Sequence, residues 1–165
     1  MSPEQLAAAE LLRLARDIEA EVEVIETLAR EVAEVVARPL PLGAEAQAYL
    51  AMKLHGWYTG LEALLERVAR LLEGSVPDGP SSRQDLLRDM TLSLPGIRPA
   101  VIDRSRLADL TELLSFRHFF RHAYAVPLDE EAMRRHAQRL GQVHQGVVAD
   151  LTSFAGVMRK MAVET

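Results

Sequence analysis

Residues 117–124 bring together two arginines, two histidines and a tyrosine at the predicted end of a helix. Four residues separate Arg117 from His122, and Tyr124 follows two positions later. Arginine carries a permanent planar cation that matches the geometry of phosphate, and the unperturbed pKa of histidine lies near neutrality. The pair is therefore suited to phosphodiester chemistry, in which arginine binds the phosphate and histidine transfers a proton.

Helical geometry limits what one copy of this segment can do. Successive residues turn by about 100°, so Arg117 and His122 diverge by about 140° around the helix. Residues three or four apart share a face, which aligns Arg117 with Arg121 and His118 with His122. One copy of the helix therefore does not present Arg117 and His122 as a compact pair.

The elements that must position this segment all have helical patterns. No part of the chain shows the sustained alternation of apolar and polar residues that favours strands. The sequence predicts an all-α, up-down helical bundle of about five helices, in a single domain over residues 1–165. The expected helices cover residues 2–37, 44–72, 83–90, 105–120 and 129–164.

The first predicted helix has strong local signals. Ser2 is placed to cap it, Pro3 occupies a favourable first-turn position, and Gln5 completes a capping box. Glutamates occupy much of its polar face, which indicates a solvated surface, with docking to a basic partner as the alternative. The apolar residues step by three or four along the other face: Leu14, Ile18, Val22, Ile25, Leu28, Val32 and Val35.

The second predicted helix has an unusual centre. Gly56 and Gly60 flank Trp57 and Tyr58, and each glycine costs a helix roughly 1 kcal/mol relative to alanine. Close packing against another helix would offset that cost. We therefore predict a tight helix crossing filled by Trp57 and Tyr58, with a ligand contact as the alternative.

Composition and charge narrow the class of protein. The 165 residues are 48% hydrophobic and 26% charged, with no cysteine for a disulfide framework or a thiolate metal site. The chain shows neither a signal peptide nor a membrane span, so we expect a cytoplasmic protein. The net charge of −5 argues against a generic nucleic-acid coat. Residues 98–139, however, hold eight basic and six acidic side chains, which permits a local positive cleft.

Three segments resemble the HepT-like proteins of the HEPN superfamily. The R-x4-H-x spacing that ends at Tyr124 is similar to the HEPN active-site motif, and the tyrosine is typical of the HepT-like branch. Residues 58–62 (Tyr-Thr-Gly-Leu-Glu) and 97–102 (Ile-Arg-Pro-Ala-Val-Ile) resemble two further blocks of that family. Residues 81–87 depart from the pattern, because Ser-Ser-Arg-Gln-Asp stands where a Trp-His pair would precede the two leucines.

The resemblance implies a metal-independent RNA endonuclease toxin without a cofactor. In that family two motif helices face a common cleft in a homodimer, which would bring two arginines and two histidines together. Arg117 and His122 would be the catalytic residues, and His118 and Arg121 would assist or bind RNA. His118 also fits the polar residue that the family usually places after the arginine.

The resemblance gives Tyr124 a separate role. In HepT-like toxin-antitoxin systems, a minimal nucleotidyltransferase antitoxin attaches AMP to the equivalent tyrosine hydroxyl. The modification would add bulk and negative charge beside a phosphate-binding site and would block RNA. The implied partners are RNA, a second copy of the chain and the nucleotidyltransferase, with no membrane.

Two other functions remain open at this stage. His118 and His122 could bind a metal from one helix face, with His136 and His144 on the next predicted helix. Against this, there is no Glu-x-x-His pair, and the neighbouring arginines would repel a divalent ion, so we expect no metal. His136 and His144, like His55, are then expected to be ordinary exposed or half-buried residues. The chain could also be a catalytically silent helical adaptor for the nucleotidyltransferase.

Overall fold

The computed structural model describes residues 1–122 and 129–165, and for residues 117–122 it describes the helical backbone but not the side chains. Within these ranges the regular secondary structure is helical, apart from one isolated bridge between Leu94 and Arg98, and turns and loops connect the helices. The predicted all-α bundle is confirmed. The elements are α1 (Pro3–Val36), α2 (Ala44–Glu73), α3 (Ser82–Asp89), the short 3-10 turn η1 (Arg104–Arg106), α4 (Leu107–His122) and α5 (Glu130–Glu164).

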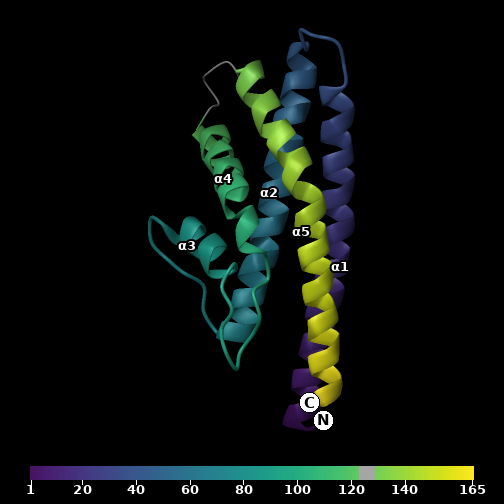
Figure 1. The fold of residues 1–165 in the computed structure, drawn as a ribbon, viewed down its shortest axis with the longest axis vertical. Helices are drawn as coiled ribbons and strands as arrows, with labels where there is room; N and C mark the ends of the chain where they lie inside the picture. The colour runs from purple at the N-terminus through teal and green to yellow at the C-terminus, as the bar shows by residue number, and fades with distance from the viewer. Residues whose placement is uncertain (123–128) are drawn as a thin grey trace.

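The three longest helices form the body of the bundle. Figure 1 shows α1, α2 and α5 running side by side, with α4 against α2 and α5 and α3 on the outside. Both chain termini lie at one end of the bundle, and the α1–α2 connection lies at the other. None of the described helices combines the length and the apolar composition that a membrane span needs.

The start of α1 follows from local chemistry, as predicted. The backbone N–H of Gln5 donates to the Ser2 hydroxyl at 3.2 Å, and the Ser2 N–H donates to the Gln5 side chain at 2.9 Å, which completes the capping box. The predicted apolar stripe is buried or packed against the core along its whole length. Glu19 and Glu31 on the polar face form ion pairs with Arg159 and Lys53.

The centre of α2 is the crossing that the glycines predicted. Trp57 is fully buried and Tyr58 is buried. A Cβ at Gly60 would collide with the carboxylate of Glu21 on α1. At Gly56, however, a Cβ would sit 3.6 Å from the Leu28 side chain, an ordinary contact, so only Gly60 marks a close approach.

The connection between α3 and α4 is organised by Arg98, whose side chain is fully buried. Its Nε lies 2.6 Å from Glu73 Oε1 at the end of α2. Its Nη1 donates to the carbonyls of Leu92 and Pro99 at 2.8 and 3.1 Å. Gly96, at a φ of 78°, provides the tight turn that returns the chain from Leu94 to Arg98. Arg98 therefore has a structural role, although the sequence alone placed it among the basic residues of a possible positive cleft.

Candidate functional site

The R-x4-H segment occupies the last turns of α4, at the end of the bundle away from the termini (Figure 1). The backbone is α-helical through His122, so positions 117 and 122 are separated by about 140° around the helix axis, as predicted. The side chains of Arg117, His118, Arg121 and His122 lie outside the described residues, as does Tyr124. Their catalytic and regulatory roles therefore stay predictions.

The start of α5, which faces this part of α4, is fixed by contacts to the α1–α2 connection. The Leu42 N–H donates to Glu130 Oε1 at 2.7 Å, and Arg134 Nη1 donates to the Val36 carbonyl at 3.3 Å. Asp129 caps α5, since its Oδ1 accepts from the N–H of Glu131 at 3.0 Å. These contacts hold the beginning of α5 in place independently of α4.

Among the described side chains, an ion pair and a ring contact connect α4 to α5. Arg139 Nη1 lies 2.7 Å from Asp109 Oδ1. Two turns of α4 nearer the motif, the rings of Phe116 and His136 have centroids 4.7 Å apart and an interplanar angle of 45°. Phe116 directly precedes Arg117, so this contact sets the position of the last described side chain before the motif.

Beside this ring contact lies a cavity of about 330 Å³, which we call the α4–α5 cavity. Apolar side chains from both helices form part of its wall, and two carboxylates, a hydroxyl and an imidazole form the rest. The described lining residues are Glu112, Ser115, Phe116, Asp129, Ala132, Met133 and His136.

His136 is a titratable residue in the lining of this cavity, and its ring contacts Phe116. Burial lowers its pKa, Arg139 lowers it further, and Glu112 acts in the opposite direction. The imidazole is therefore neutral near pH 7. Its Nδ1 atom is buried and has no hydrogen-bond partner among the described residues. A neutral ring between carboxylates offers no attraction to a phosphate group.

Fewer of the basic side chains between residues 98 and 139 are free of acidic partners, and so available to bind phosphate, than their number suggests. Arg106 pairs with Asp150 at 2.9 Å, and four more of these arginines also have acidic partners. These pairs offset much of the positive charge of this segment, and the exposed Arg104 lies outside them. The other paired arginines are Arg98, Arg134, Arg135 and Arg139.

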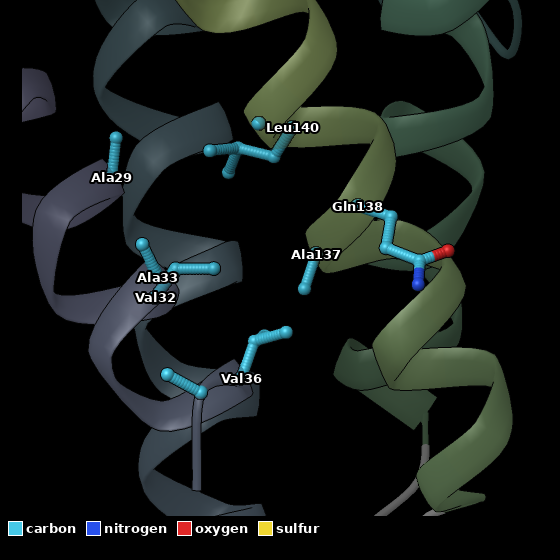
Figure 2. Close-up of a pocket in the computed structure, with 9 residues that line it drawn as sticks. Ala29, Val32, Ala33, Val36, Ala137, Gln138 and Leu140 are labelled. Atoms are coloured by element: carbon cyan, nitrogen blue, oxygen red, sulfur yellow. The ribbon is translucent and has the colours of Figure 1, made fainter.

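A second hollow lies between α1 and α5 and has a different character. It measures about 320 Å³, and its described lining contains no ionisable side chain. Figure 2 shows Ala33 and Val36 of α1 across the hollow from Ala137 and Leu140 of α5. Without an acid, a base or a nucleophile in its wall, this hollow is no candidate for a catalytic site.

His144, further along α5, belongs to the packed core rather than to a metal site. Trp57 Nε1 donates to His144 Nδ1 at 3.2 Å, and the two rings meet edge to face with centroids 6.1 Å apart. Burial lowers the pKa of His144. Over residues 1–122 and 129–165, no group of three or more histidine, cysteine or acidic side chains is placed to hold a metal. The metal-binding alternative gains no support from these residues.

The Tyr58–Glu62 block ties α2 to α3. Glu62 is buried, and its Oε1 lies 2.7 Å from Arg83 Nη1. Burial raises the pKa of Tyr58, at the other end of the block. Arg83 lies in the segment that departs from the family's expected Trp-His pair, so this chain uses that segment for an ion pair. Sequence reasoning had missed both this pair and the α4–α5 cavity, because each joins residues far apart in the chain.

A family model described as HepT-like protein matches residues 49–158, about two thirds of the chain. The chain belongs to the HepT-like family. The matched region runs from the first turns of α2 almost to the end of α5, so it contains both family blocks and the R-x4-H segment. Comparisons with curated proteins and with solved structures gave no match. Membership identifies the chain as a HEPN-superfamily protein and connects it with HEPN-type toxins at the level of the family.

Proposed function

We propose that this HepT-like chain is a metal-independent RNA endonuclease toxin that works as a homodimer in the cytoplasm, with residues 1–165 as its single domain. The observation that carries the proposal is the R-x4-H-x-Y spacing at the end of α4, within the region that the family model covers. Arg117 and His122 are the catalytic residues of the proposed site. His118 and Arg121 assist them or bind RNA.

The proposed reaction needs one proton transfer at each side of a phosphodiester. His122 takes the proton from a ribose 2′-hydroxyl, or gives one to the leaving 5′-oxygen, and such a transfer contributes about 10² to 10⁴ in rate. The 2′-oxygen bonds to phosphorus as the bond from phosphorus to the 5′-oxygen breaks. Arg117 stabilises the negative charge on the phosphoryl oxygens. The product carries a 2′,3′-cyclic phosphate. DNA has no 2′-hydroxyl to attack the phosphorus, so it is not cleaved.

Helix geometry supports the proposed dimer. Positions 117 and 122 diverge by about 140° on α4, and a two-fold axis supplies a second arginine and a second histidine to the same cleft. Five described arginines between residues 98 and 139 pair with acids, which supports this arrangement. In the proposed dimer, the motif arginines of the two copies bind the phosphate, and a broad basic surface is not needed.

Tyr124 is the proposed point of regulation. A partner minimal nucleotidyltransferase antitoxin would transfer AMP to its hydroxyl, placing a negative charge two residues from His122. We expect Tyr124→Phe to keep RNA cleavage and to escape inhibition by the partner and ATP. Intact-mass measurement before and after incubation checks the modification, and a Tyr124→Phe protein that still gains AMP would move the site elsewhere.

The nuclease proposal is tested with mixed RNA in the presence of EDTA. Unmodified wild-type protein is expected to produce fragments with cyclic phosphate ends, and His122→Ala is expected to produce none. His55→Ala, a change outside the motif, is the matched control. Absence of cleavage by protein whose Tyr124 is shown by mass spectrometry to be free of AMP would contradict the proposal. In that case, binding of the nucleotidyltransferase without cleavage would favour the adaptor.

A further inference from the structure

We propose that the α4–α5 cavity binds a nucleobase of the RNA next to the cleaved bond and that it prefers a base with an exocyclic amino group over uracil. This inference rests on the proposed nuclease function and specifies its substrate. The cavity lies between Phe116, which directly precedes the motif, and the start of α5.

The position of the cavity relative to the motif is fixed by helical register. Ser115 lines the cavity, and position 122 follows it by seven residues, two turns of the helix. The two backbone positions therefore lie on one side of α4, about 10 Å apart along its axis. One or two nucleotides of an unstacked strand span that separation. A phosphate at the motif would thus place a neighbouring base within reach of the cavity.

The size and the wall of the cavity suit a flat ring. Its volume of about 330 Å³ exceeds that of one base, and Phe116 and His136 contribute two aromatic rings from opposite helices. Proteins that recognise single-stranded RNA commonly stack unpaired bases on such side chains and hydrogen-bond their edges. Because His136 is neutral near pH 7, stacking on it does not depend on a charge.

The polar groups of the wall decide which base fits. Glu112 and Asp129 contribute carboxylates, which accept hydrogen bonds and repel phosphate. Asp129 is engaged in capping α5, whereas Glu112 is exposed and caps none of the described helices. The amino groups of cytosine, adenine and guanine can donate to a carboxylate, as cytosine N4 does in nucleic-acid complexes. Uracil has no exocyclic donor, and its carbonyl oxygens would face the carboxylate unfavourably.

Binding is measured with short 2′-O-methyl homo-oligonucleotides, which have no free 2′-hydroxyl and cannot be cleaved. Cytosine and uracil are compared because the two pyrimidines are alike in size and differ in the amino group. We expect the cytosine oligomer to shift the NMR resonances of the His136 ring and to bind about tenfold more tightly than the uracil oligomer. Glu112→Gln is expected to remove the difference, and Glu131→Gln, the same change outside the cavity, is expected to preserve it.

A cleavage arm separates this proposal from the nuclease proposal. Sequencing of the ends that wild-type protein makes in a random RNA pool is expected to show depletion of uracil on one side of the cut, and Glu112→Gln is expected to relax it. Cleavage without such a bias, or equal binding of cytosine and uracil oligomers, overturns the base cavity and leaves the nuclease intact. A preference for cytosine at His136 without any RNA cleavage supports the cavity and overturns the nuclease.

Discussion

Two histidines on α5, two turns apart, lie in environments that differ in one respect. Both are half-buried, and burial lowers the pKa of both. His144 accepts a hydrogen bond from the fully buried Trp57, so its polar atom is used by the fold. Each histidine lines a hollow, of about 330 Å³ at His136 and about 440 Å³ at His144, but the Nδ1 atom of His136 is buried without such a partner among the described residues. The fold uses the Nδ1 atom of His144, and it leaves the Nδ1 atom of His136 without a hydrogen bond to another described residue.

The difference extends to the regions around them. The contact between Trp57 and His144 joins α2 to α5 in the middle of the bundle, where apolar side chains from three helices meet. The α4–α5 cavity lies where only two helices meet, and carboxylates form part of its wall. A region built to stabilise the fold fills its space and pairs its polar atoms. The described wall of the α4–α5 cavity does neither fully, because it encloses an open volume and contains the unpaired Nδ1 atom of His136.

The largest predicted effect on stability is at Trp57. Trp57→Ala should lower the free energy of unfolding by about 3–5 kcal/mol, because it empties a fully buried volume and leaves His144 without its donor. Glu112→Gln in the α4–α5 cavity should change it by less than about 0.5 kcal/mol. Urea unfolding followed by circular dichroism measures both. Equal effects at the two positions would remove the distinction between the regions.

The two histidines give a smaller, direct comparison. His144→Ala should destabilise the fold by about 1–3 kcal/mol, since the buried Trp57 N–H loses its acceptor. His136→Ala should cost less, because the Nδ1 atom of His136 forms no hydrogen bond to the described residues. The same urea unfolding measurement decides the order. A larger loss at His136 would indicate that the ring is needed for packing and not for a ligand.

The pH dependence of stability is the third prediction. A histidine whose pKa is lowered by folding binds its proton more tightly in the unfolded chain, so its neutral form stabilises the fold above the ordinary pKa near 6.5. That contribution should be lost as the pH falls from about 7 toward 5. The slope should be at most about 1.4 kcal/mol per pH unit for each histidine. His144→Asn should flatten the curve, and an unchanged slope in that variant would contradict the assigned burial.

The smallest predicted effect is a gain at Gly56. A methyl group there would make only an ordinary contact with Leu28, and alanine favours helix over glycine. Gly56→Ala should therefore raise the free energy of unfolding by about 0.5–1 kcal/mol. Gly60→Ala should gain less or lose, because its Cβ requires the Glu21 carboxylate to move. Thermal unfolding compares the two, and a loss at Gly56 would mean that both glycines mark close packing.

The parts of the fold that depend on local chemistry could be predicted from the sequence. Ser2 and Gln5 mark the start of α1, and Asp129 marks the start of α5, because capping acts within one helical turn. The prediction of the fourth helix was less accurate at its start. A 3-10 turn capped by Asp103 occupies the predicted start, and α4 begins at Leu107.

Contacts between distant residues could not be predicted from the sequence. Arg98 is 25 residues from Glu73, and nothing in its own segment indicates that the side chain is buried. His136 was predicted as an ordinary exposed or half-buried residue, and it is half-buried, but its contact with Phe116 depends on how α4 meets α5. The resemblance to the HepT-like family could be recognised because it depends on residue type and spacing, and the roles of Arg117 and His122 stay predictions.

The central claim is that the R-x4-H segment is half of an RNA-cleaving site. Arg117→Ala and His122→Ala proteins are each expected to lack cleavage, and unfolding and refolding them together allows mixed dimers to form. Such dimers keep one intact arginine and one intact histidine, contributed by different copies, so the mixture should recover part of the wild-type rate. No recovery, with mixed dimers demonstrated by native mass spectrometry, would contradict a site shared between two copies.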